Sequence, residues 1–367
     1  MVSSILFLRN AFAVPLLFTY ALVAGAGSLN SIVSVAYSGD GAYIAAADST
    51  SNIYVWRSQS GALLDHFRPG KTTGFAPLAV GFSRNNRKLF VATQTDLEDF
   101  DLETGEATKV SSLEAMAAVF NPDKSLLAIA SDASLSVIDV ATGSHKLDFP
   151  ADSGDLLFTL SFSPDGRYLA AGNRAFERAL GIGTKTGNAS RIVKVIDVHS
   201  GRVIAQLKGS GTWYSGIAFS NDSKLVAAAS YEHEPNAPIN EESDPALTVW
   251  KLATGATIAE IPLNGNGWNF NSLMFLPDDN HVIGTATSTF DGEVYTAKVD
   301  NGCVINQTEP NRSIWSAALS PRAELIAVSG TFGEIQTLSI PQPLPSDLAG
   351  CKPESAGALQ TVQHYQN

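Results

Sequence analysis

Apolar and polar residues alternate in short runs along most of the chain, and tight turns join the runs. The clearest copies start at Ser34, Leu160 and Ile217 and read SVAYSGDGAYIAAA, LSFSPDGRYLAAG and IAFSNDSKLVAAAS. Each copy has an apolar run ending in an aromatic residue, a turn rich in Ser, Asn, Asp and Gly, and a second run of small apolar residues. Alternation with a period of two, interrupted by such turns, predicts antiparallel β-hairpins.

This cassette recurs seven times at a spacing of about 40 residues, and the fourth and fifth copies are enlarged. In each copy a third alternating run follows, as at residues 194–201 and 248–255, and a fourth run comes after it. Four strands in each of seven units predict an all-β fold, a single seven-bladed β-propeller of four-stranded antiparallel blades. The apolar residues that precede the seven turns are Tyr37, Phe82, Phe120, Phe162, Phe219, Phe275 and Leu319.

The chain resembles the WD40 and YVTN-type propeller repeats over roughly residues 30–340. The likeness is closest in the turn Ser163-Pro164-Asp165-Gly166 and in residues 249–255, which read VWKLATG. The Gly-His pair that WD40 blades place before their first strand is absent, and only Trp56 and Trp250 stand where the family's strand tryptophan would be. The resemblance therefore implies that the family's Trp-Ser-His-Asp hydrogen-bond network is missing or partial here.

The two ends of the chain differ in composition from the repeats. Arg9, the apolar run Ala11 to Ala24 and the small residues up to Ala26 read as a signal peptide at residues 1–26. We expect a propeller over 27–340 and a proline-rich tail over 341–367, and hence a secreted or periplasmic protein. The apolar run is too short to predict a membrane span.

A propeller ring also needs a closing strand, and the sequence leaves three possibilities open. Phe18 to Gly25 forms the outer strand of the last blade if it is not cleaved, in which case the protein is cytoplasmic. Otherwise the weakly alternating residues Ala358 to Tyr365 supply the strand, or the last blade keeps three strands.

Two further features fit an oxidising compartment. The chain has two cysteines, and a bridge between Cys303 and Cys351 would pin the tail to the sixth blade, although an unpaired Cys303 is an open alternative. Sequons for N-glycosylation occur at Asn188, Asn221, Asn306 and Asn311.

Charge restricts the classes of partner. The net charge is −12 and no strongly basic cluster occurs, so the sequence predicts neither a nucleic acid nor an anionic membrane surface as partner. We expect a monomer whose partner is a protein or a peptide.

The two enlarged copies owe their length to insertions between their second and third strands, at residues 173–191 and 231–246. The first insertion is basic, with Arg174 and Arg178, whereas the second is acidic, with Glu232 and Glu234. The sequence leaves three alternatives open: the two segments pair with each other, form a charged rim for a partner or a small ligand, or are disordered loops.

Large aromatic residues gather before the first strands of the fifth, sixth and seventh copies. They predict either an aromatic arc that anchors a partner or packing between neighbouring blades. The residues are Trp213, Tyr214, Trp268, Phe270 and Trp315.

The sequence shows no catalytic constellation. The six histidines lie in different repeats without metal-ligand spacing, and His233 between Glu232 and Glu234 is the best isolated candidate. We therefore predict no metal, no cofactor and no catalytic residue, and a non-enzymatic secreted propeller that binds a protein or peptide through its upper face. The alternatives are a propeller enzyme of the dehydrogenase or lactonase kind, and carbohydrate binding by the aromatic arc.

Overall fold

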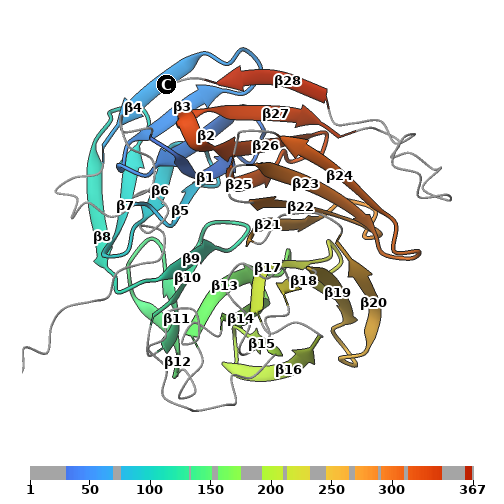
Figure 1. The fold of residues 1–367 in the computed structure, drawn as a ribbon. Helices are drawn as coiled ribbons and strands as arrows, with labels where there is room; N and C mark the ends of the chain where they lie inside the picture. The colour runs from blue at the N-terminus through green and yellow to red at the C-terminus, as the bar shows by residue number, and fades with distance from the viewer. Residues whose placement is uncertain are drawn as a thin grey trace, which may run out of the picture.

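Seven four-stranded antiparallel sheets stand around a central axis in the computed structural model (Figure 1). The structure describes residues 30–68, 76–131, 134–150, 156–174, 192–209, 213–231, 245–263, 269–287, 291–309, 313–340 and 360–365. The predicted all-β, seven-bladed propeller is confirmed. Within the described ranges, no helix is long and apolar enough to cross a membrane.

Each blade contains four strands that are consecutive in the sequence, so blade 1 is β1 to β4 and blade 7 is β25 to β28. The first strands are β1 (Ile32–Tyr37), β5 (Ala79–Phe82), β9 (Ala117–Phe120), β13 (Leu156–Phe162), β17 (Trp213–Phe219), β21 (Asn269–Phe275) and β25 (Ile314–Leu319). The second strands are β2 (Tyr43–Asp48), β6 (Lys88–Ala92), β10 (Leu126–Ala130), β14 (Tyr168–Arg174), β18 (Leu225–Tyr231), β22 (His281–Thr287) and β26 (Leu325–Gly330). The third strands are β3 (Ile53–Arg57), β7 (Asp96–Asp101), β11 (Ser134–Asp139), β15 (Ile192–Asp197), β19 (Ala246–Lys251), β23 (Gly292–Lys298) and β27 (Ile335–Ser339). The fourth strands are β4 (Leu63–Phe67), β8 (Ala107–Ser112), β12 (His145–Pro150), β16 (Arg202–Lys208), β20 (Thr257–Pro262), β24 (Val304–Glu309) and β28 (Gln360–Tyr365).

The first strand of every blade lies nearest the axis, because each first strand contacts the first strands of the two neighbouring blades (Figure 1). The fourth strands form the rim. A short 3-10 turn, η3 (Thr331–Gly333), joins β26 to β27 in blade 7.

Apolar side chains fill the wedges between blades. The described core residues form seven clusters, and each cluster joins two neighbouring blades. In β2, for example, Ala45 and Ala47 face blade 2 while Ile44 and Ala46 face blade 7, and all four are fully buried. Because both faces of the second strands are covered, these strands are continuously apolar rather than alternating.

The C-terminal segment closes the ring. β28 pairs antiparallel with β27, with Ile335 opposite Tyr365, and completes blade 7 as its outer strand. The predicted propeller boundary at residue 340 therefore falls inside blade 7. Of the three possible closures that the sequence leaves open, the structure has the strand near Ala358 to Tyr365. Residues 1–26 and Phe18 to Gly25 lie outside the described residues.

The turn between the first and second strands contains one residue with a left-handed backbone in every blade. In blade 4 this residue is Gly166, with φ of 71°, as expected from the Pro-Asp-Gly sequence. Blades 3, 6 and 7 use Lys124, Asp279 and Ala323, with φ between 52° and 60°. The turn geometry is thus kept even where the sequence lacks glycine.

Candidate interaction surface

The ring has two faces, which carry different connections. Because the strands in each blade are antiparallel and consecutive, the first and third turns of every blade lie at one end, which we call the turn face. The second connection and the link to the next blade lie at the opposite end, which we call the connection face.

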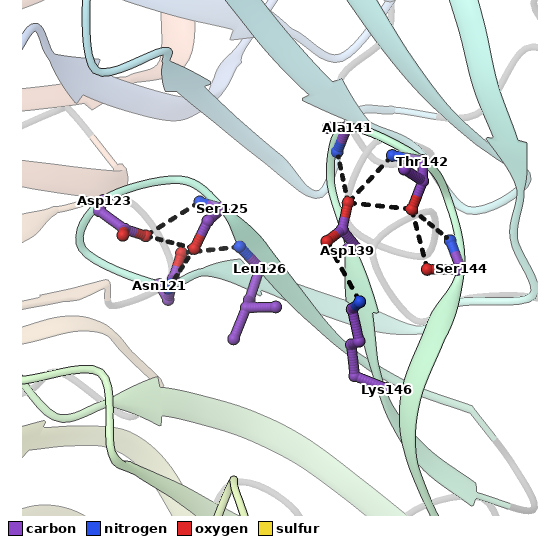
Figure 2. A network of polar contacts seen from close by, with 9 residues as sticks. All are labelled: Asn121, Asp123, Ser125, Leu126, Asp139, Ala141, Thr142, Ser144 and Lys146. Carbon is purple, nitrogen blue, oxygen red and sulfur yellow. Dashed lines mark hydrogen bonds and ion pairs between the residues drawn. The ribbon is translucent and has the colours of Figure 1, made fainter.

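Polar side chains fasten the turns of the turn face, and blade 3 shows the arrangement (Figure 2). In its first turn Asn121 Oδ1 accepts the Leu126 amide at 2.9 Å, and Asp123 accepts the Ser125 amide at 3.0 Å and its hydroxyl at 2.6 Å. In other blades a serine replaces Asn121, as where Ser163 Oγ accepts the Tyr168 amide at 2.8 Å. The Ser/Asn-x-Asp pattern therefore serves to close hairpins.

The third turn of blade 3 is held by one carboxylate. Asp139 Oδ1 accepts the Ala141 amide at 3.1 Å and the Thr142 amide and hydroxyl at 3.0 Å each, and Lys146 lies 3.5 Å from its second oxygen (Figure 2). Burial opposes ionisation of Asp139, but the bonds from Thr142 and the charge of Lys146 outweigh it and lower its pKa.

The same cause lowers the pKa of other turn carboxylates. The backbone and side chain of Ser200, together with Arg167, lower the pKa of Asp197 to about 2. The side chains of Lys224 and Ser220 lower the pKa of Asp222 to about 2 as well. These groups are ionised at neutral pH and already hold backbone amides, so they are not tuned for proton transfer.

The turns of neighbouring blades also contact one another. Asp279 Oδ1 accepts the backbone amide of Asn221 at 2.6 Å and its side-chain amide at 2.7 Å, which ties blade 6 to blade 5. The same Asn221 side-chain nitrogen donates to the Leu276 carbonyl at 2.8 Å. This is the nitrogen that a glycan at the Asn221 sequon would modify. No signal in the local sequence distinguishes Asn221 from an ordinary turn residue.

On the connection face, hydroxyl groups join the inner strands of neighbouring blades. Ser34 Oγ accepts the Val80 amide at 3.3 Å, Ser272 Oγ accepts the Ala317 amide at 2.9 Å, and Ser316 Oγ accepts the Val35 amide at 3.3 Å. Each of these serines directly follows a register shift near the start of its strand. A β-bulge redirects a side chain, so the bulges aim these hydroxyls at the next blade. The period-two alternation of the sequence does not reveal them.

Two of the five predicted aromatic anchors are core residues. Tyr214 and Phe270 are each 1% exposed. The Tyr214 hydroxyl accepts the Gly209 amide at 3.0 Å and its ring meets Trp250 edge-on, while Phe270 packs against Tyr295. The prediction that these two side chains are surface anchors is therefore wrong, since they fill the wedges between blades.

The three tryptophans occupy different positions relative to the bulges. Trp315 is the extra residue of the bulge in β25 and is half-buried, and its indole nitrogen has no hydrogen-bond acceptor in the described part of the chain. Trp213 is the first residue of β17, and Trp268 directly precedes β21 and lies outside the described residues. The side chain of Trp213 is not described either. Trp213 and Trp315 lie at the same end of the ring, but only Trp315 is a bulge residue.

The insertions are placed as predicted, between the second and third strands of blades 4 and 5. Arg174 is the last residue of β14, and Gly172 pairs with Val193 across the base of the first insertion. Arg178, Glu232 and Glu234 lie outside the described residues, as does His233.

The two strand tryptophans differ from the pattern of the WD40 network. Trp250 Nε1 donates to the backbone carbonyl of Lys208 in the preceding blade at 3.1 Å. Trp56 Nε1 is buried and lacks an acceptor within the described ranges. Neither indole donates to a serine, so these two blades lack the network, as the resemblance implied.

Ionisable groups do not converge in the described ranges, which contain no group of three or more His, Cys, Asp or Glu residues that could hold a metal ion. The buried carboxylate of Asp48 is saturated by turn contacts, among them the amides of Thr50 and Asn52 at 2.8 Å each. His281 binds Asp278 within its own turn, and His66 stacks on Tyr54.

The structure describes the predicted covalent sites only in part. Cys303 is 1% exposed and disulfide-bonded, while Cys351 lies outside the described residues. Among the sequons, Asn188 and Asn311 also lie outside them, and Asn306 is in β24, where it pairs with Tyr295.

Comparison with known protein families finds a match to one of the repeats. The family model for the WD40 repeat, described as WD domain, G-beta repeat, matches residues 23–57, a range that includes β1 to β3. The same four-strand unit recurs in all seven blades. The chain is a seven-bladed β-propeller whose first blade matches the WD40 repeat.

Structural comparison supports the propeller fold. A chain of hydrazine synthase from Kuenenia stuttgartiensis is similar to it with a TM-score of 0.67 and 14% sequence identity, over 86% of this chain and 98% of that chain. At this identity the likeness concerns the fold alone. No curated protein matches the chain in sequence.

Proposed function

We propose that this WD40-type propeller is a secreted, non-enzymatic scaffold that binds a protein or peptide on its connection face. The observation that carries the proposal is the position of the two long connections, residues 175–191 and 232–244. Both join the second and third strands of their blades, and the blades are neighbours, so both leave the ring at the same end. Rigid sheets that present variable loops are a common basis for recognition.

Aromatic and charged residues at this end supply the proposed contacts. Trp315 is half-buried at the start of the inner strand of blade 7, and Trp213 begins the inner strand of blade 5. With Trp268, they are the proposed anchors, since indole rings supply large contact areas at interfaces. Arg174, Arg178, Glu232 and Glu234 belong in sequence to the two enlarged connections and would favour a partner that carries charges of both signs.

The turn face supports the non-enzymatic part of the proposal. Asp139, Asp197 and Asp222 are committed to backbone amides, and their lowered pKa values keep them ionised. General acid-base catalysis near neutral pH needs groups whose pKa lies close to the working pH. The pKa values of Asp139, Asp197 and Asp222 are instead shifted away from neutral pH.

Peptide selection tests the proposal and does not require the partner to be identified first. The full-length protein selects peptides from a random display library, and the Kd of the winners is measured for the wild type and for Trp213→Ala, Trp268→Ala and Trp315→Ala. We expect at least one tryptophan variant to weaken binding about 10-fold or more.

The matched control is Glu103→Ala, whose side chain is 75% exposed on the turn face. It should leave the Kd unchanged. The proposal fails if Glu103→Ala weakens binding as much as the tryptophan variants, or if the selected peptides bind all four variants like the wild type. Near-ultraviolet circular dichroism confirms that each variant is folded, and a glycan array measures the carbohydrate alternative.

A further inference from the structure

The outer strand of blade 7 has an open backbone edge. β28 is the terminal strand of its sheet and pairs on one side with β27, and in the described part of the chain no strand lies on its other side. An open edge presents unpaired amide and carbonyl groups to solvent and can pair with another strand.

The other six rim strands protect their edges with charge. Each contains at least one Asp, Glu, Lys or Arg within its bounds. β28 reads QTVQHY and contains none. Charged side chains on an edge strand prevent strand-to-strand association, because pairing would bring like charges together or remove them from water. β28 is the described rim strand that lacks this protection.

Exposed apolar side chains surround this edge. Val362 is the extra residue of a bulge in β28 and is 55% exposed. Leu63 and Leu64 in the neighbouring strand β4 are 46% and 43% exposed. Tyr365 and Gln363 in β28 contact the turn that leads into β4, so β28 and β4 are neighbouring strands of the rim (Figure 1).

We propose that β28 pairs antiparallel with β28 of a second copy of this chain, which joins blade 7 of each copy in one continuous sheet. A second copy fits because a two-fold antiparallel pair places a strand against its own sequence. Pairing of β28 with its own copy brings Thr, Val and Gln side chains opposite one another. The same pairing of any other rim strand would bring charged side chains into the contact. The proposal replaces the sequence-based expectation of a monomer and is independent of the proposed function on the connection face.

Sedimentation velocity on the full-length protein tests the proposal. A single strand pair buries less area than a standard interface, so we expect a weak dimer with a Kd on the order of 10–100 μM. Val362→Lys adds a charge at a half-exposed position and should raise the Kd about 10-fold or more. A synthetic peptide with the sequence of residues 360–365 should also raise the apparent Kd.

Ile258→Lys is the matched control. Ile258 is the extra residue of the corresponding bulge in β20 and is 40% exposed, but that strand also carries Glu260. The control should dimerise like the wild type. Thermal unfolding shows that both variants are folded. Three outcomes would each overturn the proposal. The wild type is monomeric at about 500 μM, the dimer persists in Val362→Lys, or Ile258→Lys weakens the dimer as much as Val362→Lys does.

Discussion

The Tyr365 hydroxyl donates to the Ser58 carbonyl at 2.6 Å and thereby joins the last strand of blade 7 to a turn of blade 1. The Tyr365 ring is 1% exposed and meets the indole of Trp56 edge-on, with ring centroids 5.9 Å apart. Many propellers close by exchanging a strand between their ends, but here every blade is sequential. Side-chain contacts such as this one seal the ring.

Tyr365→Phe should lower the free energy of unfolding by about 1 kcal/mol, because it removes a partly buried hydrogen bond and leaves the Ser58 carbonyl without this donor. Chemical denaturation measures the change. Tyr43→Phe is the control, since the hydroxyl of the half-buried Tyr43 makes no hydrogen bond within the described residues. Equal effects of the two variants would show that the hydroxyl does not contribute to the seam.

Gly143→Ala should cost about 2–3 kcal/mol of stability. Gly143 has φ of 69°, and a β-carbon there would lie 2.9 Å from the Val110 carbonyl oxygen of blade 2. Gly105 has φ of 73° at the equivalent turn, but its β-carbon would meet nothing within 4 Å. Gly105→Ala should therefore cost only about 1 kcal/mol, from the backbone alone. If the two variants unfold at the same denaturant concentration, blade 2 has shifted to accommodate the added methyl group, and the predicted steric cost at Gly143 is wrong.

Trp250→Phe should destabilise the protein more than Trp56→Phe, by about 1–2 kcal/mol. Both indoles are fully buried, so the loss of packing is similar. Only Trp250 donates to a backbone carbonyl, and its replacement leaves the Lys208 oxygen without that donor. Thermal unfolding of the two variants gives the comparison, and the opposite order would contradict the assignment of the hydrogen bond.

Acid should weaken the turn of blade 4 as Asp197 becomes protonated. Its folded-state pKa of about 2 is below the usual value of 3.8, so its contribution is present above about pH 4 and is lost as the pH falls towards 2. Asp197→Asn should lower the melting temperature at pH 6, and the difference from the wild type should shrink below about pH 3. Glu106→Gln serves as the control, because that exposed carboxylate makes no hydrogen bond or ion pair in the described residues. A difference for Asp197→Asn that is constant with pH would contradict the prediction.

The sequence revealed the blades because the turn chemistry is local. Residues such as Asp165 and Gly166 determine their own hairpin, and seven repeats of this signal determine the count. The interfaces between blades depend instead on contacts between distant segments. Tyr214 and Phe270 look like exposed aromatics in the sequence, because nothing in their neighbourhood shows that a second blade covers them. Ser272 bonds to the next blade only because a bulge shifts its direction, and period-two alternation carries no sign of such a shift.

The sequential build of the blades, with β28 as the final strand, also affects the order of events during synthesis. Blades 1 to 6 contain all their strands once residue 309 has left the ribosome, and each can pack on the blade before it. The face of blade 1 that packs against blade 7 stays uncovered longer, because blade 7 is complete only after residues 360–365 have been synthesised. The nascent protein is therefore an open arc with two apolar faces towards solvent, one on blade 1 and one on blade 6, until blade 7 covers both.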